Sequence, residues 1–544
     1  MSEVRDWAVR AAPLALAVVL AACSSDTSGP GVVTTPTARV ALAAGEYTLL
    51  SDTQIKGAVR FPDAGASGAQ YLVVAQWATA SADFSGAFSL GRLGAGVTLP
   101  GLARREPGPA LRFHDLLRAR EADYARRARE SGALLRAPAA APRAIVPPTV
   151  GQKRTFKVCS NITCSGLKNV ASTAQFVGQH AAIFLDDSVP ANGLSAGDLG
   201  NLGAQFDQVL FPIDTSRFGS PSDIDSNGVV IVLLTKQINA LVGRPTCDTS
   251  FITGFFFSGD ITPGFATQFN NGEIFYGMVP DPAGTVSCTY STSYVRNILP
   301  VTFIHEFQHM ISFNQHVLLR GGDTEVLWLN ESLSHLAEEI GGLHYDSLND
   351  VTTASRFFIG DLYNAYLYLR NPSATAVVTE TPPGGLEQRG GGWLFLRYVE
   401  DQFGAGATRQ LVQTNQVGAL NMQAATGQAF ETLLGRWALA VFLTDAPNFT
   451  APAALKYAAW RFRATYASLN QQDPADFPLP YPLTPTTGAG GSASISGTLN
   501  AGSGAYLSVN QLANGPGFDL FFRGAGGGVL PALGGAQLAI ARIR

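Results

Sequence analysis

The sequence predicts an α+β protein whose central domain, mixed β/α in its N-terminal part and mainly helical in its C-terminal part, is flanked by small β modules. Short alternating segments near both ends predict those modules, at residues 39–100 and 484–544. In the central domain, residues 150–480, strand and helix patterns alternate at first, and helical periodicity dominates beyond residue 297. Expected strands include 181–185 and 229–234, and expected helices include 195–210, 297–316 and 329–341.

Composition narrows the classes of function. Hydrophobic residues make up 46% of the 544 residues and charged residues 14%, which is typical of a globular chain rather than a disordered one. A net charge of −4 provides no broad basic surface for phosphate groups. We therefore expect no nucleic-acid partner.

The N-terminus is typical of an export signal. Arg5 and Arg10 precede an apolar run over residues 11–22, which is too short to span a membrane. The run ends in Leu-Ala-Ala-Cys, which resembles the bacterial lipobox, so we expect residues 1–22 to be removed and Cys23 to carry lipid. An ordinary signal peptide with an incidental cysteine is the alternative. The prediction is a lipoprotein of the bacterial cell envelope, at the outer membrane or cell surface rather than the inner membrane, with residues 23–38 as a flexible tether.

Four further cysteines predict two disulfides in an exported chain. The nearest pairing joins Cys159 to Cys164 and Cys247 to Cys288. A four-thiolate zinc site is the alternative, but the two-residue cysteine spacings of zinc ribbons are absent.

Residues 101–148 contain an arginine-rich amphipathic helix pattern followed by an Ala/Pro-rich linker. Three interpretations stay open: a solvated helix, a strut between domains, and a pro-segment that is removed.

Asp223, Asp225 and Asn227, followed by Gly228, match the first half of a calcium-binding loop. The twelfth position is Leu234 rather than glutamate, so this is no EF-hand. A Ca²⁺ site and a plain Asp/Asn/Gly turn are both compatible with the pattern.

A His-Glu-x-x-His motif carries the clearest chemistry. His305 and His309 lie four residues apart, on one face of an expected helix, from which two imidazoles can reach one Zn²⁺. Glu306 lies beside the first of them and suits a general base. A third histidine in the metzincin position is missing, because Ser312 and Gln315 occupy the required places. Glu331, 22 residues after His309 on the next expected helix, supplies a carboxylate instead, as in gluzincins.

The segments HEFQHMISFNQ and WLNESLSHLAEE resemble the hyicolysin-like zinc metallopeptidases, a secreted bacterial gluzincin family, and the likeness extends over about residues 150–457. The resemblance implies a gluzincin-type catalytic domain and neutral endopeptidase activity. It places His305, His309 and Glu331 on Zn²⁺ and makes Glu306 the general base. One departure is His335, where the thermolysin branch has an aspartate. The partner of the first ligand is thus unassigned, and Glu338 is a candidate.

The expected function is zinc-dependent hydrolysis of peptide bonds in extracytoplasmic proteins, with polypeptides as substrates and a water activated by Glu306 as nucleophile. The alternative is a catalytically silent surface-binding or adhesion lipoprotein that retains the peptidase fold. A zinc aminopeptidase is a further option, although no motif for an amine-binding pocket is evident. Candidates for stabilising the oxyanion are Tyr345, Tyr363, Tyr366, His344 and Arg389, among which the sequence does not decide.

Overall fold

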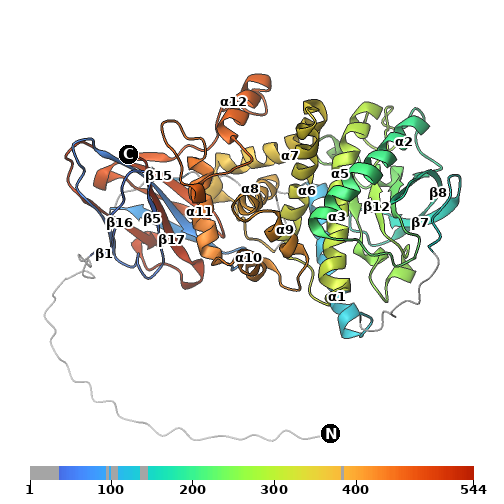
Figure 1. Cartoon of the computed structure of the whole chain (residues 1–544), viewed down its shortest axis with the longest axis horizontal. Coiled ribbons are helices and arrows are strands. Elements are labelled where there is room, and N and C mark those ends of the chain that lie inside the picture. Colours follow the sequence, from blue (N-terminus) through green and yellow to red (C-terminus); the bar gives the residue numbers. More distant parts are fainter. Residues whose placement is uncertain (1–35, 93–96, 100–107, 135–144, 381–384) are drawn as a thin grey trace, which may run out of the picture.

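The computed structural model describes residues 36–92, 97–99, 108–134, 145–380 and 385–544. The expected signal peptide, Cys23 and nearly all of the tether lie outside these residues. The molecule is elongated, with a β-sandwich at one end, helices in the middle and a mixed sheet at the other end (Figure 1). Within the described residues, no helix combines the length and the apolar character that a membrane crossing requires.

The mixed sheet belongs to the first part of the central domain. Its six strands lie in the order β11-β12-β10-β9-β8-β7. They are β7 (Lys153–Cys159), β8 (Leu167–Val177), β9 (Ala181–Asp186), β10 (Val230–Leu234), β11 (Gly254–Phe256) and β12 (Ile274–Gly277). Strands β9, β10 and β12 run parallel, whereas β11 pairs antiparallel with β12 and forms one edge. Helices α2 (Ala196–Gln205), α3 (Phe211–Phe218) and α4 (Lys236–Asn239) belong to the same part, and a π-helical turn joins α2 to α3.

Helices follow from residue 292, close to where the sequence predicts them. They are α5 (Thr292–Phe313), α6 (Leu327–Ser347), α7 (Val351–Arg370), α8 (Leu386–Phe403), α9 (Ala405–Val412), α10 (Gly418–Thr426), α11 (Phe430–Leu443) and α12 (Phe462–Gln472). Helix α5 begins at a cap in which the Ser291 hydroxyl accepts from the Tyr294 N–H, and its residues from Leu299 onward are all buried. It is therefore a central helix, packed between the mixed sheet and the other helices.

Glycines at the start of α8 let it approach α6 and α7 closely. A Cβ on Gly390 would lie 2.1 Å from the carbonyl carbon of Asn364 in α7, and one on Gly392 would lie 2.4 Å from the Ser332 hydroxyl in α6. Any larger residue would push the helices apart. This close packing brings Arg389, the residue before the glycines, next to α6.

The two expected β modules form one β-sandwich, so the prediction of separate flanking modules is wrong. The N-terminal strands are β1 (Pro36–Arg39), β2 (Tyr47–Leu50), β3 (Ala58–Phe61), β4 (Ala69–Trp77), β5 (Ser85–Gly91) and β6 (Val97–Thr98). The C-terminal strands are β13 (Thr486–Ala489), β14 (Ile495–Asn500), β15 (Gly504–Gln511), β16 (Phe518–Gly524) and β17 (Ala536–Arg542). The sheets have the orders β1-β3-β16-β5-β14-β6 and β13-β15-β4-β17-β2, so both contain strands from each end of the chain.

The physical reason is that neither group of strands can bury its apolar side chains alone. Trp77 of β4 stacks on Phe522 of β16 with ring centroids 5.3 Å apart, inside a core drawn from both groups. The other face of the sheet that contains β4 packs on α11, where the Tyr506 hydroxyl donates to the Ala438 carbonyl at 2.9 Å. Strand β4 is thus covered on both faces and has a C-terminal strand on each side.

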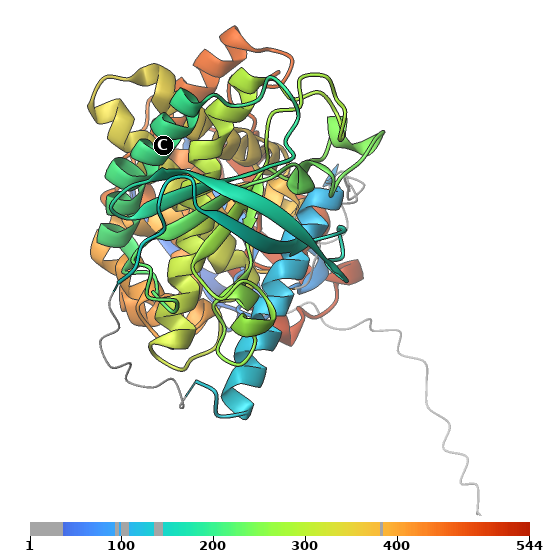
Figure 2. The ribbon, with the colours of Figure 1, turned by 90° about the vertical axis from the view of Figure 1, so that its right-hand side faces the viewer.

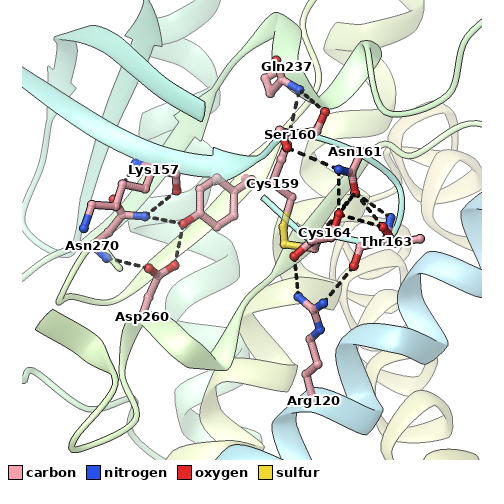
Figure 3. Close-up of a disulfide and its surroundings, with 12 residues drawn as sticks. Arg120, Lys157, Cys159, Ser160, Asn161, Thr163, Cys164, Gln237, Asp260 and Asn270 are labelled. Atoms are coloured by element: carbon pink, nitrogen blue, oxygen red, sulfur yellow. Dashed lines mark hydrogen bonds between the residues drawn. A yellow bond between two sulfur atoms is a disulfide. The ribbon is translucent and has the colours of Figure 1, made fainter. Parts of the chain in front are cut away.

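Helix α1 (Pro109–Glu130) is the arginine-rich segment, and it runs beside the mixed sheet (Figure 2). Both expected disulfides, Cys159–Cys164 and Cys247–Cys288, are present. Arg120 of α1 reaches the first of them, because its guanidinium donates to the carbonyls of Thr163 and Cys164 at 2.8 Å each (Figure 3). The helix is therefore fastened to the mixed sheet rather than fully solvated.

Candidate active site

Two adjacent helices bring together the three expected metal ligands. His305 and His309 lie on α5, and Glu331 lies in the first turns of α6. The Nε2 atoms of His305 and His309 each lie 3.7 Å from an oxygen of Glu331. One ligand atom from each of the three side chains lies within 4.8 Å of the others. All three residues are buried, so the group forms a compact internal cluster.

The cluster leaves polar atoms without partners. Nε2 of His309 and Oε1 of Glu331 are buried, and neither makes a hydrogen bond. Buried polar atoms in native proteins nearly always have a partner, so this pair needs an explanation. Two imidazole nitrogens and a carboxylate oxygen that face one another are a donor set that suits Zn²⁺. The residues present therefore fit the expected metal.

Hydrogen bonds on the far side of each imidazole set its orientation. Nδ1 of His309 lies 2.8 Å from Oδ1 of Asn330, and Nδ1 of His305 lies 2.6 Å from Oε1 of Glu338. Each oxygen accepts a hydrogen bond from Nδ1–H, which leaves the lone pair of Nε2 directed toward Glu331. Glu338 is thus the partner of the first histidine that the sequence left unassigned.

A second buried group supports Glu338. His335 lies 3.1 Å from Glu338 and 2.8 Å from Asp361, measured from its Nδ1 to the nearest carboxylate oxygens. Burial alone would lower the pKa of His335, but the two carboxylates raise it to about 10. His335 therefore carries a positive charge, and this charge holds the pKa of Glu338 at about 2 despite its burial. The histidine that departs from the thermolysin pattern thus keeps Glu338 ionised.

Arg389 compensates the charge of Glu331. Its Nη1 donates to Oε2 of Glu331 at 2.6 Å, and both side chains are buried. Burial alone would raise the pKa of Glu331, but the Arg389 guanidinium holds it well below its ordinary value. Burial also lowers the pKa of His309 well below the usual imidazole value. An ionised carboxylate beside a neutral imidazole is the protonation state that metal binding requires.

Glu306 lies beside this cluster and next to the edge strand of the mixed sheet. Its Oε2 accepts from the N–H of Phe256 in β11 at 2.8 Å. Burial raises the pKa of its carboxyl group, while His305 and Arg118 act in the opposite direction. A carboxylate with a raised pKa, fixed by one backbone hydrogen bond, suits proton transfer.

Helix α1 covers the same strand and the same cluster. Arg118 donates to the carbonyl of Phe256 at 3.3 Å and pairs with Glu121 at 3.0 Å. Burial raises the pKa of Glu121 to about 7, although Arg118 and a hydrogen bond with Asn330 oppose the shift. Asn330 therefore contacts both α1 and His309. The helix lies against residues that orient the expected ligands.

The N-terminal end of α1 adds two aromatic side chains. Phe113 is completely buried, and its ring meets that of Phe255 edge to face with centroids 5.0 Å apart. His114 lies within electrostatic reach of Arg389, Glu331 and His305. Desolvation, with Arg389 as the next cause, lowers the pKa of His114 to about 3. His114 therefore stays neutral near the cluster.

Several sequence candidates lie elsewhere. The Tyr345 hydroxyl accepts from Gln205 at 2.7 Å, and the Tyr366 hydroxyl accepts from the N–H of Leu479 at 2.7 Å. Tyr363 packs against Phe477, and His344 packs against Tyr345 near the C-terminal end of α6. Of the five oxyanion candidates, the structure places Arg389 in direct contact with the cluster.

The contributions of α1, Asn330 and the backbone of β11 to the site were not expected from the sequence. The amphipathic pattern of residues 101–148 identifies a helix but not the surface that it covers. Asn330 stands out in the sequence only as the neighbour of Glu331, although a side-chain oxygen next to a ligand is a signal for a partner of an imidazole. The three-residue strand β11 has no alternation long enough to detect.

Comparison with known proteins supports a distant relationship to metalloproteases. No family model matches the chain. The neutral metalloprotease ShpI of Staphylococcus hyicus is 25% identical over 183 residues, which cover 33% of this chain and 38% of that protein. The match thus spans well under half of the relative. Among solved structures, a mutant of an M1 zinc metallopeptidase from Deinococcus radiodurans matches 53% of this chain and 51% of its own, with 13% identity and a TM-score of 0.28. The same mutant enzyme bound to a Tyr-Ser-Ala substrate matches 53% of this chain and 60% of its own, with 14% identity and a TM-score of 0.27.

Proposed function

We propose that the protein is a zinc-dependent endopeptidase that hydrolyses peptide bonds of extracytoplasmic proteins. The observation that carries the proposal is the pair of buried, unpartnered atoms, Nε2 of His309 and Oε1 of Glu331, which lie 3.7 Å apart beside His305. The distant relationship to a neutral metalloprotease supports it.

The residues would divide the chemistry as follows. His305, His309 and Glu331 hold Zn²⁺, while Asn330 and Glu338 keep the two imidazoles in position. When bound, the ion acidifies a water molecule and polarises the peptide carbonyl. Oε2 of Glu306 is held by the Phe256 N–H, so Oε1 takes the proton from water and later transfers it to the leaving amine.

The edge of the mixed sheet would receive the substrate. Strand β11 is the terminal strand, and the hydrogen bonds of Phe256 are directed to Glu306 and Arg118 rather than to β12. An extended peptide that binds such an edge gains main-chain hydrogen bonds irrespective of its sequence. This position supports polypeptides as the substrate class.

Helix α1 occupies that edge, and we propose that it is an inhibitory segment, in line with the pro-segment interpretation. Arg118 takes the Phe256 carbonyl that an extended peptide would use, and Phe113 covers the neighbouring Phe255. A peptide cannot pair with β11 while α1 lies there. Activity would thus require displacement or removal of the helix.

A catalytically silent binding protein is the alternative. A binding protein has no need of Glu306, whose carboxylate is nevertheless held beside the cluster by a backbone hydrogen bond. The enzyme is therefore the function that the geometry supports best.

The decisive experiment compares two proteins that both carry Phe113→Ala, a change intended to loosen α1. The parent carries this change alone, and the second protein carries Glu306→Gln in addition. Glutamine keeps the shape of the side chain but cannot take a proton, so hydrolysis of an unfolded protein should fall by about 10²–10⁴-fold. Zinc should stay at one ion per chain, measured by atomic absorption. The exposed Glu130, changed to Gln, is the control. Equal rates for Glu306→Gln and its parent, or a parent that binds no zinc, would contradict the proposal.

We also propose that Cys23 anchors the protein by lipid to the outer membrane or cell surface. The support is the lipobox-like sequence that ends at Cys23, together with two disulfides, which form outside the cytosol.

A further inference from the structure

A second group of carboxylates lies at strand ends of the mixed sheet and shares no residue with the candidate active site. Asp223 and Asp225 belong to the loop before β10, and Glu273 immediately precedes β12, the neighbouring parallel strand. One oxygen from each of the three carboxylates lies within 4.8 Å of the others. The sequence motif contains only the two aspartates and Asn227. Glu273 lies far from them in the sequence, and the pairing of β10 with β12 brings it close.

The loop has the geometry of an oxygen-rich turn. Oδ1 of Asp223 accepts from the N–H groups of Asn227 and Gly228 at 3.0 and 3.2 Å. Ser226 and Gly228 have φ values of +58° and +74°, which wrap the backbone around the aspartates. The amide oxygen of Asn227 accepts from the N–H of Val229 at 2.8 Å and thus stabilises the turn. These contacts alone would be compatible with a plain turn.

The environment of Glu273, outside the loop, indicates more than a plain turn. The residue is 1% exposed, and its Oε1 accepts from the Ser222 hydroxyl at 2.6 Å and from the Ile224 N–H at 3.0 Å. Its Oε2 is buried and makes no hydrogen bond. A buried carboxylate oxygen without a partner is costly, because the charge has lost its water. The nearby aspartates add repulsion rather than compensation.

Within the described ranges of the chain, the positive charge near the three carboxylates does not balance their negative charge. Nη1 of Arg154 lies 3.9 Å from Oδ2 of Asp225, which is longer than a hydrogen bond. The guanidinium is directed elsewhere, since its Nη2 donates to the carbonyl of Asn270 at 2.6 Å and it lies over the ring of Phe156. Among the residues that the structure describes, the three carboxylates therefore face one distant cation.

We propose that Asp223, Asp225 and Glu273 bind a Ca²⁺ ion, with Glu273 in the role that the last glutamate of a calcium loop plays. The donors are hard carboxylate oxygens from a loop and a strand end, which suit Ca²⁺ because it accepts variable geometry, whereas Mg²⁺ demands a near-ideal octahedron. The ion would fasten the loop before β10 to the start of β12. It would thus stabilise the parallel strands of the mixed sheet without taking part in hydrolysis.

The test measures binding of ⁴⁵Ca²⁺ by equilibrium dialysis to the full mature chain, with zinc retained in the buffer. We expect one Ca²⁺ per chain, and a dissociation constant raised by tenfold or more in both Glu273→Gln and Asp223→Asn. Asp187→Asn changes an exposed carboxylate in the same part of the protein and should leave binding unchanged. Mg²⁺ at the same concentration should displace little of the bound Ca²⁺.

Three results would overturn the proposal. They are no Ca²⁺ bound by the parent chain, equal binding by both variants and the parent, and full displacement by equimolar Mg²⁺. The first result would mean that Glu273 is a protonated acid in a plain turn. Asp223 is exposed, so Asp223→Asn remains informative if Glu273→Gln fails to fold. The readout does not involve hydrolysis, so it is independent of the proposed peptidase activity.

Discussion

Replacing Phe113 by alanine should activate the intact protein. Phe113 is completely buried, and it packs edge to face on Phe255 in the edge strand. Removing a buried phenylalanine costs about 3–5 kcal/mol in protein cores. We take the lower value, because part of this packing persists when α1 is detached as a helix. A loss of about 3 kcal/mol in docking energy raises the population of the open state by about 100-fold.

The assay is the initial rate of cleavage of an internally quenched peptide by the intact, zinc-loaded chain. In Phe113→Ala the cleavage rate should rise by up to about 100-fold over the parent. The increase is smaller if α1 becomes detached in most molecules, because the open state cannot exceed full population. Phe88→Ala is the matched control, because it removes a buried phenylalanine from the β-sandwich without touching α1. It should lower the melting temperature without raising the rate.

An unchanged or lower rate in Phe113→Ala, with zinc content and circular dichroism like the parent, would refute this reasoning. A lower rate in particular would mean that α1 forms a wall of the active site instead of blocking it.

Three other predictions concern the ligand set, the anchor and pH. Glu331→Ala should lose zinc and hydrolysis together, because it removes one of three ligands and leaves Arg389 unpaired; full zinc occupancy, measured by atomic absorption, would exclude Glu331 as a ligand. Cys23→Ser should move the protein from the membrane fraction to the soluble fraction, and unchanged partition after a salt wash would contradict the lipid anchor. Burial raises the pKa of Asp260 from 3.8 to about 7, so the folded state keeps a proton that the unfolded state loses as the pH rises. The loss of this proton should therefore lower the free energy of unfolding by up to about 4 kcal/mol between pH 4 and pH 7. Urea titrations of Asp260→Asn should show a pH dependence that is smaller than that of the parent by this amount.

The grouping of the three candidate ligands was predictable because the information is local. His305 and His309 are one helical turn apart, and Glu331 follows on the next helix, so spacing along the sequence translates directly into spacing in the structure. The same holds for the two disulfides, whose cysteines are the nearest neighbours along the chain. Helices α5 and α6 were also close to the expected ranges 297–316 and 329–341, because long periodic patterns carry strong signals, whereas the short helices α9 and α10 were not expected.

The β-sandwich was not predictable, because strand pairing is not encoded in the alternation of a single strand. Arg60 in β3 pairs with Asp519 in β16 across 459 positions, and no local pattern connects them. The contacts of α1 had the same limitation. Arg118 and Glu121 read as surface charges of an amphipathic helix, yet both are buried against the edge strand and the ligand-orienting Asn330.

The interleaved sandwich has a consequence for a chain that is cut. Strand β4 lies between β15 and β17, and β16 lies between β3 and β5. A single cut between β5 and β7 would produce two fragments that remain one particle, held together by two shared sheets and a common core. If α1 is to leave, the chain must be cut on both sides of it, and the part that carries the candidate active site would still remain attached to the N-terminal strands. Loss of the proposed inhibitory helix and retention of the proposed lipid anchor would therefore be compatible in the same molecule.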